Sequence, residues 1–172
     1  MTTPLLSYEE QIPILSLERT PKILFAMLWD QCEKIALSNE GAGTWSPKEV
    51  VAHLLFMDKF NWIERVKVLV NNKEILNKFD LKKQFEGIAH KNLNQLLQEF
   101  EKTRSENLEY LKSVCLKNNP LHSFNGVHPD YGKINLQELL STWVAHDLTH
   151  IHQISRVMAK SFKETIVLSL LE

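Results

Sequence analysis

The chain has 172 residues with a formal net charge of −1, and 44% of its residues are hydrophobic. This composition is typical of a globular protein and excludes a disordered chain, and without a basic stripe we expect no nucleic-acid partner. No apolar run approaches the ~20 residues that span a bilayer, the N-terminus does not resemble a signal peptide, and the cysteines are too few for a disulfide framework. We therefore predict a single domain over residues 1–172, located in the cytoplasm and without membrane contact.

The first long stretch with helical periodicity follows a recognisable start signal. Thr20-Pro21 is typical of an N-cap followed by proline in the first turn, which predicts a helix from there through Leu37. Residues 7–19 begin with a further capping sequence at Ser7, but Pro13 interrupts it. A short helix and a packed arm both fit this segment.

Two further helices are expected in the middle of the chain. The sequence from Ser46 to Glu49 is a capping box with proline at the first helical position, and it predicts a helix to about Val70. Asp80 is the predicted cap of a third helix, which should end near Val114.

The last helix is predicted from a second capping box, Asn135 to Glu138, to about Lys160. Residues 121–133 form the longest irregular segment, and no stretch alternates long enough to predict a strand. The apolar tail 166–171 should pack on the molecule or on another subunit. Four long helices with short connections predict an all-α fold, an antiparallel four-helix bundle.

The last predicted helix carries the most informative residues. His146 and His150 are four residues apart, so their Cβ atoms lie ~5–6 Å from each other on one face, a workable spacing for two ligands of one metal ion. On a helical wheel His150 falls inside the apolar stripe, His146 on its shoulder and His152 on the far side. That stripe consists of Leu136, Leu139, Leu140, Trp143, Ile154, Val157 and Met158.

A third ligand is predicted on the second helix. His53 is the sole ionisable residue in the run 50–57, on a face shared with Met57, Phe60 and Glu64. Three neutral imidazoles would leave an open coordination position and the full +2 charge of the ion, which suits a catalytic site. Imidazole ligands fit Zn, Ni, Cu and Fe. Glu64 lies too far along the helix to ligate the same ion easily.

Other readings of these residues stay open. An i,i+4 histidine pair also arises by chance, and a histidine on an apolar face is usually a hydrogen-bonded core residue. Asp147 falls within the stripe, where it either supports a ligand or accepts a hydrogen bond from another helix. Cys32 and Cys115 are expected to be buried apolar residues without a catalytic role.

Three pieces of the chain resemble the DinB-like superfamily, which includes bacillithiol transferases and mycothiol-dependent maleylpyruvate isomerases. They are residues 45–50 with His53, the loop 128–132, and the stretch 136–158 with His146 and His150. The resemblance implies an up-down-down-up four-helix bundle. It also implies a divalent ion, often zinc or nickel, on the three histidines, and frequent homodimers.

Two functions follow from this reading. In the first, the protein is a metal-dependent enzyme that activates a low-molecular-weight thiol or a water for attack on a small electrophilic substrate, by transfer or hydrolysis, in detoxification or stress response. In the second, the ion only holds the bundle together in a structural or interaction protein. A polar and aromatic groove beside the ion would favour the enzyme, and a sealed apolar surround would favour the structural role.

Overall fold

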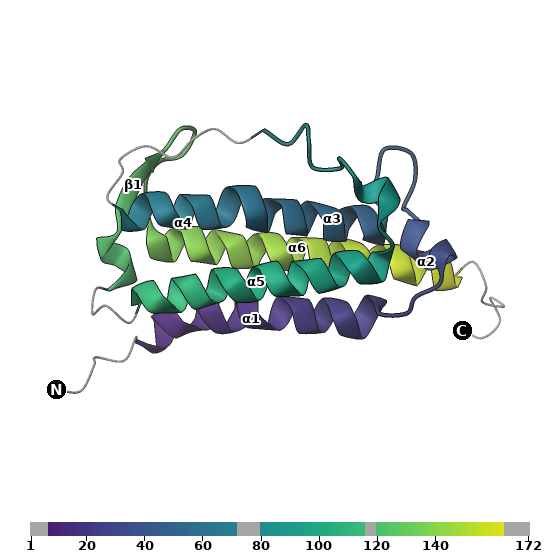
Figure 1. Cartoon of the computed structure of the whole chain (residues 1–172), viewed down its shortest axis with the longest axis horizontal. Coiled ribbons are helices and arrows are strands. Elements are labelled where there is room, and N and C mark those ends of the chain that lie inside the picture. The colour runs from purple at the N-terminus through teal and green to yellow at the C-terminus, as the bar shows by residue number, and fades with distance from the viewer. Residues whose placement is uncertain (1–6, 72–79, 116–119, 164–172) are drawn as a thin grey trace.

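The computed structural model describes residues 7–71, 80–115 and 120–163 and is built almost entirely of helices (Figure 1). Its elements in chain order are α1 (Tyr8–Leu28), α2 (Glu33–Leu37), α3 (Pro47–Met57), the π-helical turn η1 (Asp58–Trp62), α4 (Ile63–Val70), η2 (Ile88–His90), α5 (Leu93–Cys115), η3 (Leu121–Ser123), β1 (Asn125–His128), β2 (Gly132–Asn135) and α6 (Leu136–Lys163). The predicted apolar tail lies outside the described residues. None of the described helices is long and apolar enough to cross a membrane.

The four long rods of the bundle are α1, the continuous α3–η1–α4, α5 and α6. Figure 1 shows α1 and α6 running in one direction and the other two rods running in the opposite one, which is the up-down-down-up order. Both α1 and α3 pack against α5 and α6. The predicted all-α fold and its up-down-down-up topology are therefore confirmed.

The first helix begins earlier than predicted. Ser7 forms a capping box with Glu10, and α1 then continues through Pro13 and Pro21 to Leu28, so the predicted start at Thr20 was wrong. A proline inside a helix removes one backbone donor and frees the carbonyl four residues earlier. Pro21 frees the carbonyl of Leu17 in this way, and a side chain of α5, described below, bonds to it instead. Residues 33–37, predicted to continue this helix, form the separate helix α2.

The second rod follows the predicted bounds but contains a π turn. Its capping box at Ser46 is present, and α3, η1 and α4 continue without a break to Val70. A π turn inserts one residue into the helical period, so a helical wheel that starts at His53 is out of phase from Asp58 onward. Phe60, predicted to face the core, is therefore 56% exposed, and Glu64 lies at the surface in an ion pair with Lys67.

The third long helix begins at Leu93, so the predicted cap at Asp80 was wrong. Asn92 and Gln95 form the actual cap, because each side chain accepts the other residue's backbone N–H, at 2.8 and 2.9 Å. Gly87, with φ of 76°, sits in the turns that precede it. These turns lie beside α3 and bring residues 84 and 85 to the candidate site.

A small hairpin replaces the irregular loop that was predicted before α6. Strands β1 and β2 pair antiparallel, from Asn125 opposite Asn135 to His128 opposite Gly132. Gly132 has a φ of 76°, a left-handed conformation that glycine adopts without steric cost, and it closes the turn. Four-residue strands are too short to show a period in the sequence, so the prediction of no strand was wrong.

Candidate metal centre

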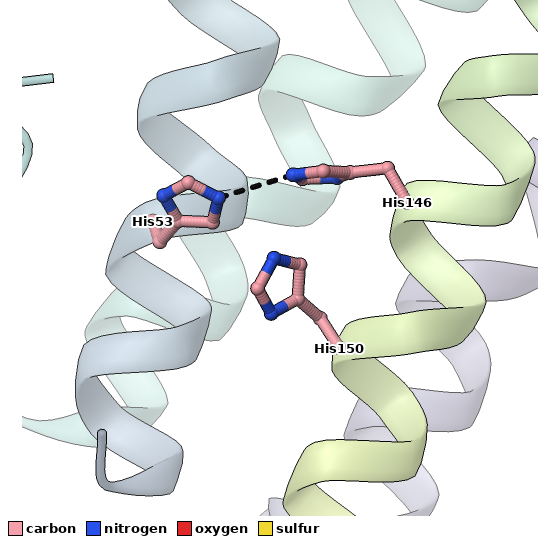
Figure 2. A group of neighbouring side chains, drawn as sticks. All are labelled: His53, His146 and His150. Carbon is pink, nitrogen blue, oxygen red and sulfur yellow. Dashed lines mark hydrogen bonds between the residues drawn. The ribbon is translucent and has the colours of Figure 1, made fainter. Parts of the chain in front are cut away.

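The three predicted ligands come together between α3 and α6 (Figure 2). One ring nitrogen from each of His53, His146 and His150 lies within 4.8 Å of the other two. The Nε2 atoms of His53 and His146 are 3.1 Å apart. Antiparallel packing of α3 and α6 places His53 opposite the i,i+4 pair His146 and His150. The spacing on one helix and the contact between the two helices are therefore enough to bring the three histidines together.

The other ring nitrogens of two histidines are held by glutamines. Nδ1 of His53 lies 2.6 Å from Oε1 of Gln84, and Nδ1 of His150 lies 3.0 Å from Oε1 of Gln153. An amide oxygen only accepts, so each bond places the proton of a neutral imidazole on Nδ1. The lone pair then resides on Nε2, which is the form needed to bind a metal ion.

Nδ1 of His146 is buried and has no hydrogen-bond partner among the described residues. A carboxylate oxygen of Asp147 lies 3.9 Å away, beyond hydrogen-bond distance. Adjacent helical positions diverge, which keeps this pair apart. Among the described residues, the outer nitrogen of His146 is therefore not held by a side chain as those of His53 and His150 are.

Burial favours the neutral form of His53 and His150. Loss of hydration lowers the pKa of His53 to about 4, against the opposing effect of its bond to Gln84. Burial and the neighbouring His146 also lower the pKa of His150. Neutral histidines in proximity are competent ligands at neutral pH, whereas protonated ones would repel a cation. The donor set therefore fits a divalent transition-metal ion.

Aromatic rings enclose the three histidines. Trp45 lies 4.8 Å from His53 and stacks on His150 at 5.9 Å between ring centroids, while Phe85 meets Trp45 edge-on. Trp62, the last residue of the π turn, presents its ring to His146 at 5.3 Å. The side chain of His146 is still 20% exposed, so the group is reachable from solvent.

A charged network lies directly behind the site and touches all four rods. The guanidinium of Arg104 on α5 donates to both carboxylate oxygens of Asp58, at 2.6 and 2.8 Å, and to Asp147 at 2.7 Å. It also donates to the Leu17 carbonyl freed by Pro21, and the hydroxyl of Thr20 donates to Asp147 at 2.8 Å. Arg104, Asp58 and Asp147 have side chains that are at most 1% exposed.

The two carboxylates of this network share one cation and differ in proton affinity. Burial raises the pKa of Asp58 to about 6, although Arg104 opposes that effect. Burial acts on Asp147 in the same direction, but Arg104 and its hydrogen bonds outweigh it and hold the pKa below its usual value. With both acids ionised the network carries a formal charge of −1, a complement to a cation at the histidines.

Other residues considered from the sequence lie outside the histidine group. His152 is exposed, as the wheel predicted, and Glu64 stays at the surface. Cys115 is buried, and burial raises the pKa of its thiol to about 11. Cys32 is exposed, so its predicted burial was wrong.

Four contributors were not found from the sequence: Gln84, Gln153, Arg104 and Asp58. Gln153 had a visible signal, since it stands three residues after His150 on the same helix face. Gln84 lies in turns that were read as helix, and Arg104 carried no local signal. Asp147 was identified as a buried carboxylate, and its bonds to Arg104 and Thr20 confirm the interhelical alternative.

Taken together, the fold and the site define a four-helix bundle with three histidines gathered between two of its helices. Comparison with protein families gives a match to the DinB superfamily over residues 16–154. The chain belongs to the DinB superfamily. The curated proteins compared with it gave no significant match.

Among solved structures the chain is similar to YfiT from Bacillus subtilis, with a TM-score of 0.76 and 19% sequence identity. The match covers 94% of this chain and 93% of that one. YfiT is described as a probable metal-dependent hydrolase with an unusual four-helix bundle topology. At this identity the likeness establishes the common fold.

Proposed function

We propose that His53, His146 and His150 bind one divalent metal ion through their Nε2 atoms and that the protein is a metal-dependent enzyme. The observation that carries the proposal is the convergence of three imidazole nitrogens within 4.8 Å from two helices. Two of the rings are also fixed in the metal-binding tautomer by Gln84 and Gln153. The description of YfiT as a probable metal-dependent hydrolase is consistent with this role.

The proposed reaction is activation of a low-molecular-weight thiol or a water for attack on a small electrophile, by transfer or hydrolysis. A metal ion on three neutral ligands would supply strong Lewis acidity that lowers the pKa of a thiol or water beside it. The chain's own residues would hold the geometry and protect the reacting group from bulk water behind Trp45, Phe85 and Trp62. Detoxification or stress response is the proposed setting.

Zinc and nickel are the proposed metals, because an all-imidazole donor set suits both. Metal analysis of protein purified without a histidine tag should find about one equivalent. His150→Ala should lose the metal, whereas the matched variant His152→Ala, two residues away and exposed, should keep it. Equal metal content in both variants would contradict the assignment.

Activity is tested with a panel of thiols, electrophiles and hydrolysable esters and amides. Turnover should disappear with chelator, return with added metal and be absent from His150→Ala. Activity that survives complete metal removal would contradict the enzymatic proposal while leaving the metal site itself intact. Cytoplasmic location and a homodimeric state stay predictions, the second measurable by light scattering.

A structural role for the ion is the second candidate, supported by the enclosure of the histidines by Trp45, Phe85 and Trp62. An ion at this position joins α3 to α6. In that case cobalt-substituted protein would show a spectrum unaffected by added thiols, and no substrate would be turned over. A spectrum that changes with thiol concentration favours the enzyme.

A further inference from the structure

Unpartnered polar groups gather at the end of η1 and the start of α4, next to the histidines. Nε1 of Trp62 and Nε of Arg65 are buried nitrogen donors with no hydrogen-bond partner among the described residues. Oδ1 of Asn61 is in the same condition, and Asn61 and Trp62 are only 3% and 4% exposed. Buried polar groups are normally paired, so such a cluster indicates a ligand or ordered water. Its position on a π turn agrees, because these insertions are frequent at functional sites.

The hairpin before α6 contributes a further donor. His128 at the end of β1 is buried, and its Nδ1 accepts the backbone N–H of Asp130 at 3.1 Å. In the neutral ring the proton is then on Nε2, which becomes a donor. Burial and the charge of Arg65 both lower the pKa of His128, which places the guanidinium near this ring. Strand β1 packs against α4, in agreement with that proximity.

Trp62 and Arg65 follow one another along the rod that also carries His53. The ring of Trp62 meets His146 at 5.3 Å, and Arg65 follows Trp62 by three residues, about 5 Å further along the helix axis. Nε of Arg65 has no hydrogen-bond partner among the described residues. The charge of Asp130 acts on Arg65 and favours its ionised form, opposing the desolvation that lowers its pKa.

We propose that Trp62, Arg65 and His128 form an anion-binding subsite for a carboxylate at the far end of a ligand whose reactive end lies at His53, His146 and His150. The inference rests on the proposed function and extends it to the class of substrate. The unpaired N–H donors on Nε1 of Trp62 and Nε of Arg65, together with the Nε2–H of His128, match the oxygens of a carboxylate, and the planar guanidinium suits it in particular. Asn61 then offers its side-chain amide to a polar group of the same ligand.

The test uses cobalt-substituted full-length protein and two thiols that differ at one end. 6-Mercaptohexanoate and 6-mercapto-1-hexanol have the same length, and the binding of each to cobalt is followed by absorption spectroscopy. Wild-type protein should bind the carboxylate about tenfold more tightly, as expected for one charge-assisted hydrogen-bonded contact. Arg65→Gln should bind both thiols equally, with the affinity for the alcohol unchanged. Lys67→Gln, a matched loss of one positive charge at the surface of the same helix, should keep the preference.

Equal binding of both thiols by the wild type, or a preference that survives in Arg65→Gln, would overturn the subsite. If neither thiol changes the cobalt spectrum, the thiol branch of the proposed function fails, and hexanoate decides the subsite separately. In metal-free protein hexanoate should shift the indole N–H resonance of Trp62 saturably in the wild type and not in Arg65→Gln. Absence of the shift would overturn the proposal. Circular dichroism is used to check that each variant is folded. If Arg65→Gln is unfolded, Arg65→Lys takes its place. Because Arg65→Lys keeps the charge but not the planar guanidinium, it should lose part of the preference for the carboxylate thiol.

Discussion

Two polar groups lie side by side in this bundle, and they solve the problem of burial in opposite ways. The network of Arg104, Asp58 and Asp147 is charged, fully buried and satisfied by its own members and by Thr20 and the Leu17 carbonyl. The histidine group is partly exposed, burial favours the neutral form of His53 and His150, and one ring nitrogen of each histidine lies within 4.8 Å of the other two. They meet at adjacent residues of α6, His146 and Asp147.

The difference shows how to distinguish a structural polar group from a ligand-binding site. A buried charge is tolerated only when its partners are already in place. In the histidine group the outer nitrogens of two rings are bonded to Gln84 and Gln153, while one nitrogen of each ring converges with the other two at a single point. A polar group whose hydrogen bonds are all made within the protein has a structural role. A group whose potential ligand atoms converge on one point is suited to binding.

The largest effect is expected from breaking the charged network. Arg104→Met keeps an extended side chain of similar size but leaves Asp58 and Asp147 without their cation. We expect a loss of about 3–5 kcal/mol in the free energy of unfolding, the usual cost of removing one partner of a buried ion pair. The measurement is denaturant unfolding at pH 7.

The matched control is Arg156→Met, because Arg156 pairs with Glu40 at the surface of α6. Exposed ion pairs are screened by solvent and contribute little, so this variant should remain close to the wild type. If both variants lost the same free energy of unfolding, burial would not be what makes the Arg104 ion pairs important for stability. The contrast between the charged network and the histidine group would then be unsupported.

The second prediction concerns pH and the histidine group without metal. The folded pKa of His53 is about 4 and its unfolded value is 6.5, so the unfolded chain takes up the proton first as pH falls. The contribution of His53 to stability is therefore fully present above pH 6.5 and is lost as pH drops toward 4. We expect the difference in unfolding free energy between the wild type and His53→Leu, both with chelator, to fall by roughly 3 kcal/mol from pH 8 to pH 4.

Asp58 has the opposite dependence, because its raised pKa means that the folded state takes up a proton first. It is present in both proteins, so its effect cancels in the difference. A difference that does not change with pH would mean that His53 is not neutral and desolvated in the folded state.

Much of this arrangement follows from local sequence. The capping box at Ser46 and that from Asn135 to Glu138 located two helix starts, since a cap depends only on residues three apart. The i,i+4 spacing of His146 and His150 and the apolar surroundings of His53 identified the three histidines, because helix geometry fixes which side chains share a face.

The remainder depends on contacts that are distant in sequence. Pro21 resembles a helix start, but it lies inside α1, where the carbonyl that it frees accepts a hydrogen bond from Arg104 on another helix. The π turn has no periodic signal in the sequence, so the helical wheel did not include it. The wheel therefore placed Phe60 and Glu64 on the wrong face of the helix. The segment that supplies Gln84 has its place fixed by packing on α3, not by its own propensity.

The third prediction sharpens the role of the glutamines. Gln153→Leu removes the acceptor that orients His150 while leaving the ligand itself in place. Loss of such a supporting group typically weakens metal affinity about 10–100-fold. Competition with a chromophoric chelator measures the affinity, and Gln137→Leu on the same helix is the control. An unchanged affinity in Gln153→Leu would mean that the hydrogen bond does not select the tautomer.

The smallest effect is expected where the two polar groups meet. Thr20→Val replaces a hydroxyl that donates to Asp147 with a methyl group of the same shape, while Arg104 continues to hold that carboxylate. Losing one such bond costs about 1–3 kcal/mol, and the low end applies because the charge remains paired. Denaturant unfolding measures the loss. The control is Thr142→Val, because the Thr142 hydroxyl donates to a carbonyl of its own helix, and this variant should stay within about 0.5 kcal/mol of the wild type.

Metal affinity should not change in Thr20→Val if Asp147 keeps its position. If Thr20→Val weakened metal binding but left the free energy of unfolding unchanged, the assigned role would be wrong. Thr20 would then act through Asp147 on His146 and would not stabilise the bundle.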